Sequence, residues 1–337
     1  MELYAGIDLH SNNSVVCVLD EQDREVLRKR LPNDLPIIQA ALEPYRAQLV
    51  GVAVESTFNW YWLVDGLMEA GFAVRLVNPT RVKQYDGLKH TNDFTDAAYL
   101  AHLMRLGILP EGYIYPKQTR AVRDLLRKRS QLVRERTRMI LSIQNILWRN
   151  TGQRLHSDVI KRLGRDGAET LLTDPHQGLA VQASLAVLGC LQQQIALIER
   201  AVLAQCKTHA AFERLKTVCG IGDILALTIL LETGEISRFA KVGQYASYCR
   251  CVDSRRESNG KKKGENNRRS GNPYLSWAYV EAANLAVCHY PEVQRYYQRK
   301  KAKTKGVIAI KAIAHKLARA SFYVMRDEVT FDMGKAF

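Results

Sequence analysis

The first hundred residues alternate strand and helix patterns in an order that constrains the fold. Three short apolar runs with turn-type residues between them predict three antiparallel strands, at residues 3–8, 14–19 and 25–30. The segments that follow predict in turn a helix, a buried strand, a helix, a strand and a helix, at residues 35–45, 49–54, 60–70, 73–77 and 93–106.

Three antiparallel strands followed by a β-α-β region are the order of the ribonuclease H-like fold. The sequence therefore predicts a mixed α/β domain of this type, which we place at residues 1–115. In this fold the first and fourth strands lie side by side, so the ends of residues 3–8 and 49–54 would meet.

Residues 117–150 are strongly basic and have a helical repeat of apolar positions. They contain ten Lys and Arg against two acids, a local net charge of +8, and predict one long amphipathic helix. A second apolar helix is predicted at about 179–206. The two could form an antiparallel hairpin, a coiled coil between subunits, or part of a plain helical bundle. We place this helical region at residues 116–208.

The remaining residues, 209–337, form a third predicted domain that is mostly helical. Val218-Cys219-Gly220-Ile221-Gly222 precedes a helix expected at about Asp223. This turn resembles a helix-hairpin-helix element, in which backbone amides at Gly220 and Gly222 would bind phosphates. A turn that serves only helix packing explains the same residues.

Charge and composition point to a nucleic-acid partner. The chain has 49 Lys and Arg against 34 Asp and Glu, a formal net charge of +15, which favours a polyanion. No apolar run reaches the roughly 20 residues of a membrane span, and MELYAGIDLH lacks the basic start of a signal peptide. We therefore expect a cytoplasmic protein with no membrane partner. The seven cysteines include no CxxC pair, so neither structural zinc nor a disulfide framework is expected.

Four acids fall at positions where this fold would bring them together. Asp8 ends the first strand and Glu55 follows the fourth, while Asp93 and Asp96 are three residues apart at a helix start. Close carboxylates repel one another unless a cation compensates them. Mg²⁺ or Mn²⁺ suits such an all-oxygen site, and two such ions support phosphoryl transfer.

Each acid also has a simpler explanation. Asp8 fits a turn after a strand, and Glu55 fits an exposed strand end. Asp93 with Asp96 fits a helix cap and a charge that compensates the helix dipole. Their joint placement favours the metal-site hypothesis.

The segment that follows residue 252 is the most polar of the chain. From Arg250 to Trp277, both included, there are eight basic residues and three acids. Such a glycine-flanked basic loop suits a phosphate backbone, and the residues expected to bind nucleic acid here are Arg255, Arg256, Lys261, Lys262, Lys263, Arg268 and Arg269. Ser258 is a candidate nucleophile among these cations. Ser254 is a similar candidate, and a solvated loop serine is the alternative.

Several motifs in order resemble the DEDD transposases of bacterial insertion sequences, relatives of the Piv-type DNA invertases. The N-terminal motifs are GIDLH, AVEST and NDFTDAAYLA. The C-terminal motifs are TVCGIGDILALTIL and the stretch from CVDS through SNGKKKG to SGNPYL. The resemblance covers nearly the whole chain, and residues 150–205 are its least distinctive part.

The resemblance implies a metal-binding tetrad that matches Asp8, Glu55, Asp93 and Asp96. It also implies a strand-joining serine in the C-terminal domain, for which Ser258 is the best match, although Asn259 intervenes before Gly260. A RuvC-like domain, a helical coiled-coil insert, a C-terminal transposase domain and a homo-oligomer, a dimer or tetramer, are implied as well. Some relatives are directed to DNA by a structured guide RNA.

The leading hypothesis is thus a DNA transposase that cuts and rejoins strands with a Mg²⁺-binding tetrad and a serine nucleophile. A Holliday-junction-type nuclease that hydrolyses DNA with water is the first alternative, because it needs only the acids. A non-enzymatic nucleic-acid-binding protein on a degenerate nuclease fold is the second.

Overall fold

The computed structural model describes residues 1–82, 93–163, 172–206, 209–253, 256–264 and 270–337. The chain divides into two compact units, Met1–Lys117 and Gln118–Phe337. The predicted three domains, 1–115, 116–208 and 209–337, remain a prediction.

The first unit is built on a five-stranded sheet with the order β3-β2-β1-β4-β5. The strands β1, β2 and β3 are antiparallel, and β4 and β5 run parallel to β1. The bounds are β1 (Leu3–Leu9), β2 (Asn13–Leu19), β3 (Glu25–Pro32), β4 (Leu49–Glu55) and β5 (Val74–Val77). The predicted meander and β-α-β region are confirmed, and so is the α/β class.

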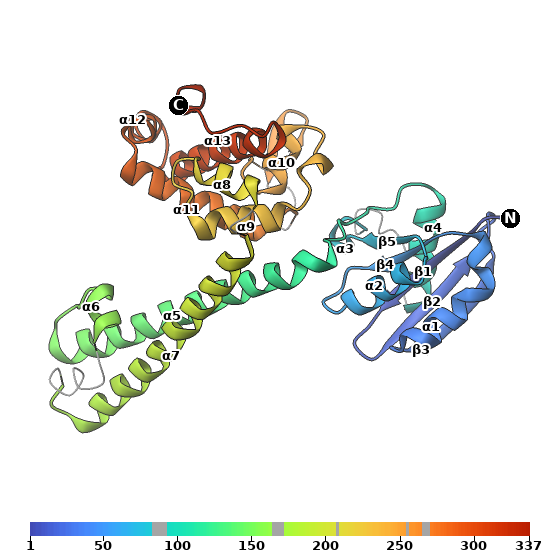
Figure 1. The fold of residues 1–337 in the computed structure, drawn as a ribbon, viewed down its shortest axis with the longest axis horizontal. Helices are drawn as coiled ribbons and strands as arrows, with labels where there is room; N and C mark the ends of the chain where they lie inside the picture. The colour runs from blue at the N-terminus through green and yellow to red at the C-terminus, as the bar shows by residue number, and fades with distance from the viewer. Residues whose placement is uncertain (83–92, 164–171, 207–208, 254–255, 265–269) are drawn as a thin grey trace. The chain divides into compact units, whose positions relative to one another are not determined.

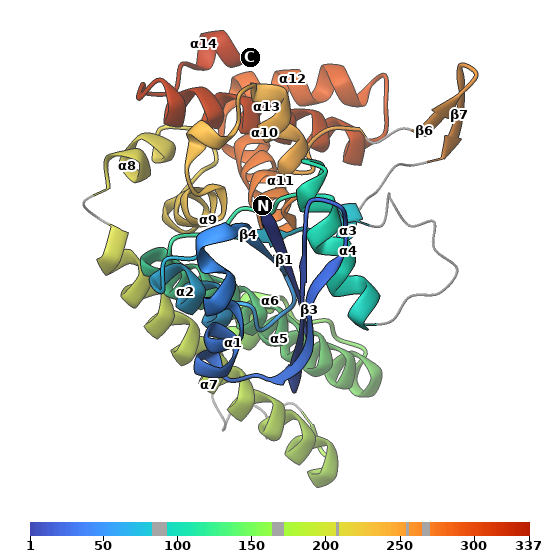
Figure 2. The same cartoon turned by 90° about the vertical axis from the view of Figure 1, so that its right-hand side faces the viewer.

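Helices cover both faces of this sheet. Figure 2 shows α1 and α2 on one face of the sheet and α4 on the other. Apolar residues of these helices pack against the strands on their side. The bounds are α1 (Leu35–Leu42), the 3₁₀ turn η1 (Glu43–Gln48), α2 (Tyr61–Glu69), α3 (Pro79–Val82) and α4 (Asp93–Arg105). All seven residues of β1 are therefore buried, because this strand lies in the middle of the sheet with helices on both sides.

The second unit begins with a helical hairpin. The long helix α5 (Lys117–Thr151) returns, after the short α6 (Ser157–Arg162), as α7 (Pro175–Cys206), and the two long helices lie side by side and antiparallel in Figure 1. Ile143 of α5 packs in one apolar cluster with Val181 and Leu188 of α7. Of the three arrangements open from the sequence, the chain thus has the hairpin within one copy.

Helix α7 is long and apolar enough to cross a membrane by length and mean hydropathy, although polar residues interrupt its apolar positions. Length and composition alone are weak evidence for a membrane span. Val181, Leu185 and Leu188 of this helix are buried within the hairpin, as expected for a helix that packs on a protein partner.

The remainder of the second unit is a helical core. Its helices are α8 (Ala210–Lys216), α9 (Asp223–Thr233), the 3₁₀ turn η4 (Ile236–Arg238), α10 (Val242–Tyr248), α11 (Pro273–His289), α12 (Pro291–Lys301), α13 (Gly306–Arg326) and α14 (Met333–Ala336). A two-stranded hairpin of β6 (Arg256–Ser258) and β7 (Lys261–Gly264) lies between α10 and α11. The segment predicted as a loop therefore contains a β-hairpin.

A buried ion cluster joins α5 to this helical core. Glu232 of α9 is 3% exposed and accepts hydrogen bonds from Arg127 Nε (2.6 Å), Arg123 Nε (3.2 Å) and Asn272 Nδ2 (2.7 Å). Asn272 also caps α11, because its Oδ1 accepts from the amides of Tyr274 and Leu275. We call these four residues, Arg123, Arg127, Glu232 and Asn272, the Glu232 cluster. It links α5, α9 and the start of α11.

Candidate active site

Asp8 and Glu55 lie at the carboxyl ends of two neighbouring parallel strands. The register pairs Ile7 of β1 with Val54 of β4, so the next residues, Asp8 and Glu55, are level with each other. Because alternate residues of a strand point to the same face, Asp8 shares the face of Gly6, which α4 covers. The carboxyl edge of parallel strands is where ligands bind in open α/β sheets.

Gly6 lets α4 come close to the strand that carries Asp8. A Cβ atom at this position would fall on the carbonyl oxygen of Ala97, and it would also lie 2.9 Å from the amide nitrogen of Ala101. Only a glycine permits this approach of helix backbone to strand. Asp93 and Asp96, in the first turn of α4, are thereby brought to the end of β1.

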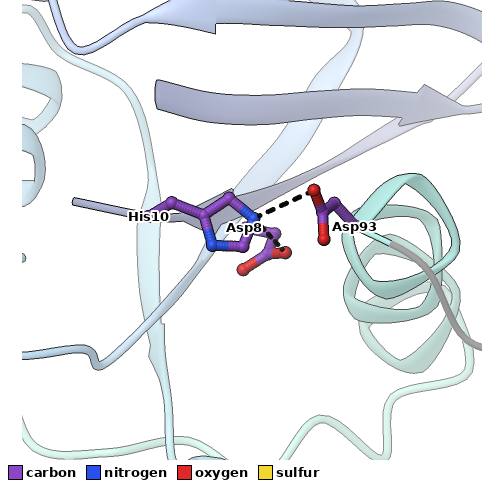
Figure 3. A group of neighbouring side chains, drawn as sticks. All are labelled: Asp8, His10 and Asp93. Carbon is purple, nitrogen blue, oxygen red and sulfur yellow. Dashed lines mark ion pairs between the residues drawn. The ribbon is translucent and has the colours of Figure 1, made fainter. Parts of the chain in front are cut away.

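The structure brings His10 into the same place, and sequence reasoning missed it. One ligand atom each from Asp8, His10 and Asp93 lies within 4.8 Å of the others, as drawn in Figure 3. His10 Nε2 is 3.2 Å from Asp8 Oδ2 and 3.5 Å from Asp93 Oδ2. The signal was present in the sequence, because Asp8 and His10 are two residues apart at a strand end and so share a face.

The backbone of His10 is held by three neighbouring segments. Its amide donates to the carbonyl of Asn13 (2.9 Å), and its carbonyl accepts from Asn33 Nδ2 (3.0 Å) and Asn59 Nδ2 (3.1 Å). The imidazole Nε2 is buried and does not have hydrogen-bond geometry with either carboxylate, although both lie at ion-pair distance. The backbone of His10 is thus held in place, and its ring nitrogen lies between the Asp8 and Asp93 carboxylates at ion-pair distance from both.

The two strand-end acids, Asp8 and Glu55, both have raised pKa values. Burial raises the pKa of Asp8, and the charges of Asp96 and Asp93 add to this, while His10 opposes it. Burial likewise raises the pKa of Glu55, and the charge and hydrogen bond of Asp8 raise it further. A bound cation would relieve this repulsion.

Asp93 is in a different environment from the two strand acids. It accepts a hydrogen bond of 2.6 Å from Arg30 Nη2, which lowers the pKa of the Asp93 carboxyl. The guanidinium groups of Arg28 and Arg30 both lie over the ring of Phe94, at 4.5 and 5.4 Å from its centre. The strand β3 therefore supplies positive charge on one side of the acids.

These residues fit a divalent cation. Carboxylate oxygens with one imidazole nitrogen form a donor set that Mg²⁺ or Mn²⁺ accepts, and the nitrogen favours Mn²⁺. The three-residue group contains two of the four predicted acids, Asp8 and Asp93. Glu55 lies close enough to Asp8 for the Asp8 charge to raise the pKa of the Glu55 carboxyl, and the charge of Asp96 raises the pKa of both strand acids.

Ser258 lies in the second unit, at the end of β6. Its partner across the hairpin is Lys261, and the two residues between them, Asn259 and Gly260, have φ angles of 52° and 69°. Two positive φ values at an Asn-Gly pair make a type I′ turn, the turn that suits a tight hairpin. Ser258 is exposed beside this turn, and Asn259, which separates it from Gly260, is a turn residue.

The basic residues around Ser258 are only partly described. Lys261 and Lys263 are exposed on β7. The side chains of Arg256 and Lys262 lie outside the described part of the chain. So do four whole residues of the predicted site, namely Ser254, Arg255, Arg268 and Arg269.

The two glycines before α9 have different surroundings. Gly220 has a φ of 80°, and a Cβ there would fall on the carbonyl oxygen of Ala282, so this glycine allows close packing against α11. Gly222 is the residue before the first turn of α9 and has open space around it. Of the two, Gly222 is the one with room for a phosphate.

Comparison with known proteins identifies the family. An IS110-type DEDD transposase model matches residues 5–149, and a model described as the transposase IS116/IS110/IS902 family matches residues 212–298. The chain belongs to this family of transposases. The motif resemblance noted in the sequence is therefore confirmed.

Curated relatives match this transposase along nearly its full length. A probable family 20 transposase of Pseudomonas aeruginosa is 26% identical and is covered over 98% of both chains. The transposase for insertion sequence element IS1111A of Coxiella burnetii is 22% identical, covering 98% of this chain and 91% of the relative. The transposase for IS1328 of Yersinia enterocolitica is 24% identical over 97% of both.

Family membership implies an enzyme of an insertion sequence that cleaves and rejoins DNA. It also implies DNA as a partner and dependence on a divalent metal ion, for which the Asp8–His10–Asp93 group is a candidate.

Proposed function

We propose that this transposase cuts and rejoins DNA by phosphoryl transfer through a serine–DNA intermediate. The proposed metal ligands are Asp8, Glu55, Asp93 and Asp96, and the proposed nucleophile is Ser258. The observation that carries the proposal is the meeting of Asp8 and Glu55 with the first turn of α4 at one edge of the sheet.

The order and connection of the strands support a ribonuclease H-like, or RuvC-like, first domain. When bound, two divalent cations would polarise the scissile phosphate and stabilise the leaving oxygen. Asp8 is buried and Glu55 is half-buried at two neighbouring strand ends, so both offer oxygens held by the sheet, while α4 adds Asp93 and Asp96.

Ser258 would attack a phosphodiester of the DNA. Its Oγ forms a bond to phosphorus, one P–O bond of the backbone breaks, and the serine proton ends on the released hydroxyl of the DNA strand. The reverse step with a different strand rejoins the backbone. Lys261 and Lys263, exposed on the same hairpin, would hold the phosphates of the strand near Ser258.

Further partners follow from the same proposal. The nucleic-acid-binding set comprises the two lysines just named with Arg255, Arg256, Lys262, Arg268, Arg269, Gly220 and Gly222. A structured guide RNA and a homo-oligomer are proposed on the family resemblance alone. A cytoplasmic location is proposed because the DNA substrate is there.

The proposal is tested on a plasmid that carries the gene with its own flanking DNA. We expect Asp8→Asn and Ser258→Ala to abolish strand exchange, and we expect Ser184→Ala, at a partly exposed serine of α7, to leave it unchanged. Wild type should form a protein–DNA adduct resistant to denaturation, which Ser258→Ala should lose. Strand cleavage by Ser258→Ala without an adduct would instead support hydrolysis by water.

A further inference from the structure

The loop that follows Glu55, one of the proposed metal ligands, exposes an aromatic side chain three residues further along the chain. Phe58 is 87% exposed, the highest value among the large hydrophobic side chains that the structure describes. Its neighbour Trp60 is 9% exposed and packs with α2 in the core of the first unit. The loop therefore directs one aromatic residue inward and the other into solvent.

This loop is held by hydrogen bonds on both sides of Phe58. The amide of Ser56 donates to the carbonyl of Val77 (3.1 Å), and Thr57 Oγ1 donates to Asn59 Oδ1 (2.9 Å). Asn59 Nδ2 donates in turn to the carbonyl of His10 (3.1 Å). The position of Phe58 is thus tied to β5 and to His10.

A large aromatic side chain on the protein surface is favourable if a binding partner buries it. A single exposed apolar residue is common on protein surfaces, but this ring is three residues from Glu55 and is linked through Asn59 to His10. Successive bases of a DNA strand are about 3.4 Å apart along the axis. A phosphate held at the carboxylates therefore has bases within reach of a side chain on the same loop.

We propose that Phe58 is a stacking platform for an unpaired DNA base next to the phosphate that is cut. The inference rests on the proposed function, because the carboxylates are what would place the phosphate there. Aromatic rings stack on any base with little sequence preference. The residue would thus hold the strand open locally, whatever sequence is being recombined.

The test uses the full chain with Ca²⁺ and a DNA duplex that has a central mismatched bubble. One probe carries 2-aminopurine in the bubble, and a second carries 5-iodouracil for photo-crosslinking. We expect wild type to quench the 2-aminopurine and to crosslink at Phe58. Phe58→Ala should lose both signals and bind the bubble about tenfold more weakly (~1.4 kcal/mol), and Phe58→Trp should restore them.

Two controls separate this inference from the proposed function. Met68→Ala removes another exposed apolar side chain of the first unit, on α2, and should leave both signals intact. Asp8→Asn should abolish strand exchange but keep the crosslink at Phe58, because Glu55, Asp93 and Asp96 would still hold Ca²⁺ and the phosphate. If Phe58→Ala quenches 2-aminopurine as strongly as wild type does, Phe58 is not a stacking platform. This holds even if Asp8→Asn abolishes strand exchange as proposed.

Other results would also overturn it. Crosslinking of Phe58 to an iodouracil-labelled RNA but not to the DNA bubble would assign the ring to RNA. A change in oligomeric state on Phe58→Ala, with unchanged signals from the DNA probes, would assign it to a protein contact.

Discussion

His10 contributes the one nitrogen donor among the candidate metal ligands. The side chain is two residues from Asp8, and its Nε2 is buried within 3.5 Å of oxygens from both Asp8 and Asp93. Imidazole binds Mn²⁺ better than Mg²⁺. The identity of residue 10 should therefore influence which ion the transposase prefers.

His10→Ala should weaken Mn²⁺ binding about tenfold or more, and Mg²⁺ binding less. Isothermal titration of each ion into the metal-free protein measures both affinities. The matched control is His102→Ala, because His102 also lies beside a carboxylate, 2.9 Å from Asp23, at another place in the first unit. Equal losses in the two variants would contradict a ligand role for His10.

The acids and the histidine differ in how far the sequence could reveal them. The positions of Asp8 and Glu55 at strand ends and of Asp93 at a helix start could be predicted, because apolar patterns indicate where strands end and helices begin. His10 was missed because it falls among the turn-type residues 10–13 between the first two predicted strands. The 2.6 Å contact of Arg30 with Asp93 joins residues 63 positions apart, and no local pattern predicts which rotamers meet across a sheet.

At the scale of elements, the approach of α4 to β1 depends on Gly6. An added methyl group would meet the backbone of Ala97 and Ala101, which cannot move without moving the helix. We expect Gly6→Ala to destabilise the protein by ~1–3 kcal/mol. It should also weaken divalent-ion binding, because Asp93 and Asp96 move with α4.

Urea unfolding and titration with Mn²⁺ measure the two effects of Gly6→Ala. Gly112→Ala is the control, because a Cβ there would lie 3.5 Å from its nearest neighbour, an ordinary contact. Unchanged ion affinity in Gly6→Ala would show that the helix start does not hold the ion.

The Glu232 cluster should be a main source of stability in the second unit. Glu232→Ala leaves the buried guanidinium of Arg123 and the half-buried one of Arg127 without this carboxylate, and removal of one partner from a buried pair costs ~3–5 kcal/mol. Glu135→Ala breaks the exposed pair with Arg138 and should cost below ~1 kcal/mol. Urea unfolding at neutral pH compares the two variants.

The same cluster predicts a pH dependence. Burial raises the pKa of Glu232, but the hydrogen bond and charge of Arg127, with the charge of Arg123, outweigh it, so the net pKa is lowered. A lowered folded-state pKa gives stability that is present above the unfolded pKa and is lost as pH falls through the folded value. The difference between wild type and Glu232→Ala should shrink in that acidic range, and a constant difference would contradict this assignment.

The position of the long helix α5 could be predicted from the sequence, but the burial and the partners of its arginines could not. Its position was readable, since α5 spans Lys117–Thr151 where residues 117–150 were predicted. Its arginines were expected on polar faces, yet Arg120 and Arg123 are 4% and 7% exposed, and Arg129 binds Glu199 of α7. A helical repeat identifies the apolar face, but Glu232 lies more than a hundred residues away and gives no local signal.

At the scale of the whole molecule, the excess of positive charge should dominate DNA affinity. The net charge of +15 implies the release of counterions on binding, so affinity should fall steeply as salt rises. Each phosphate contact contributes about one to the slope of log K against log salt. This slope can assign individual lysines to the DNA interface without knowledge of the target sequence.

The double substitution Lys261→Ala with Lys263→Ala should lower that slope by about two, because both side chains are exposed on β7 next to Ser258. Affinity should fall equally for unrelated DNA sequences, since phosphate contacts carry no base information. Fluorescence anisotropy over a salt series measures the slope. Lys335→Ala, exposed near the C-terminus and 3.8 Å from Asp332, is the control and should leave the slope unchanged. If the double variant keeps the wild-type slope, the β6–β7 hairpin does not contact the DNA backbone, and the proposed role of Ser258 loses its main physical support.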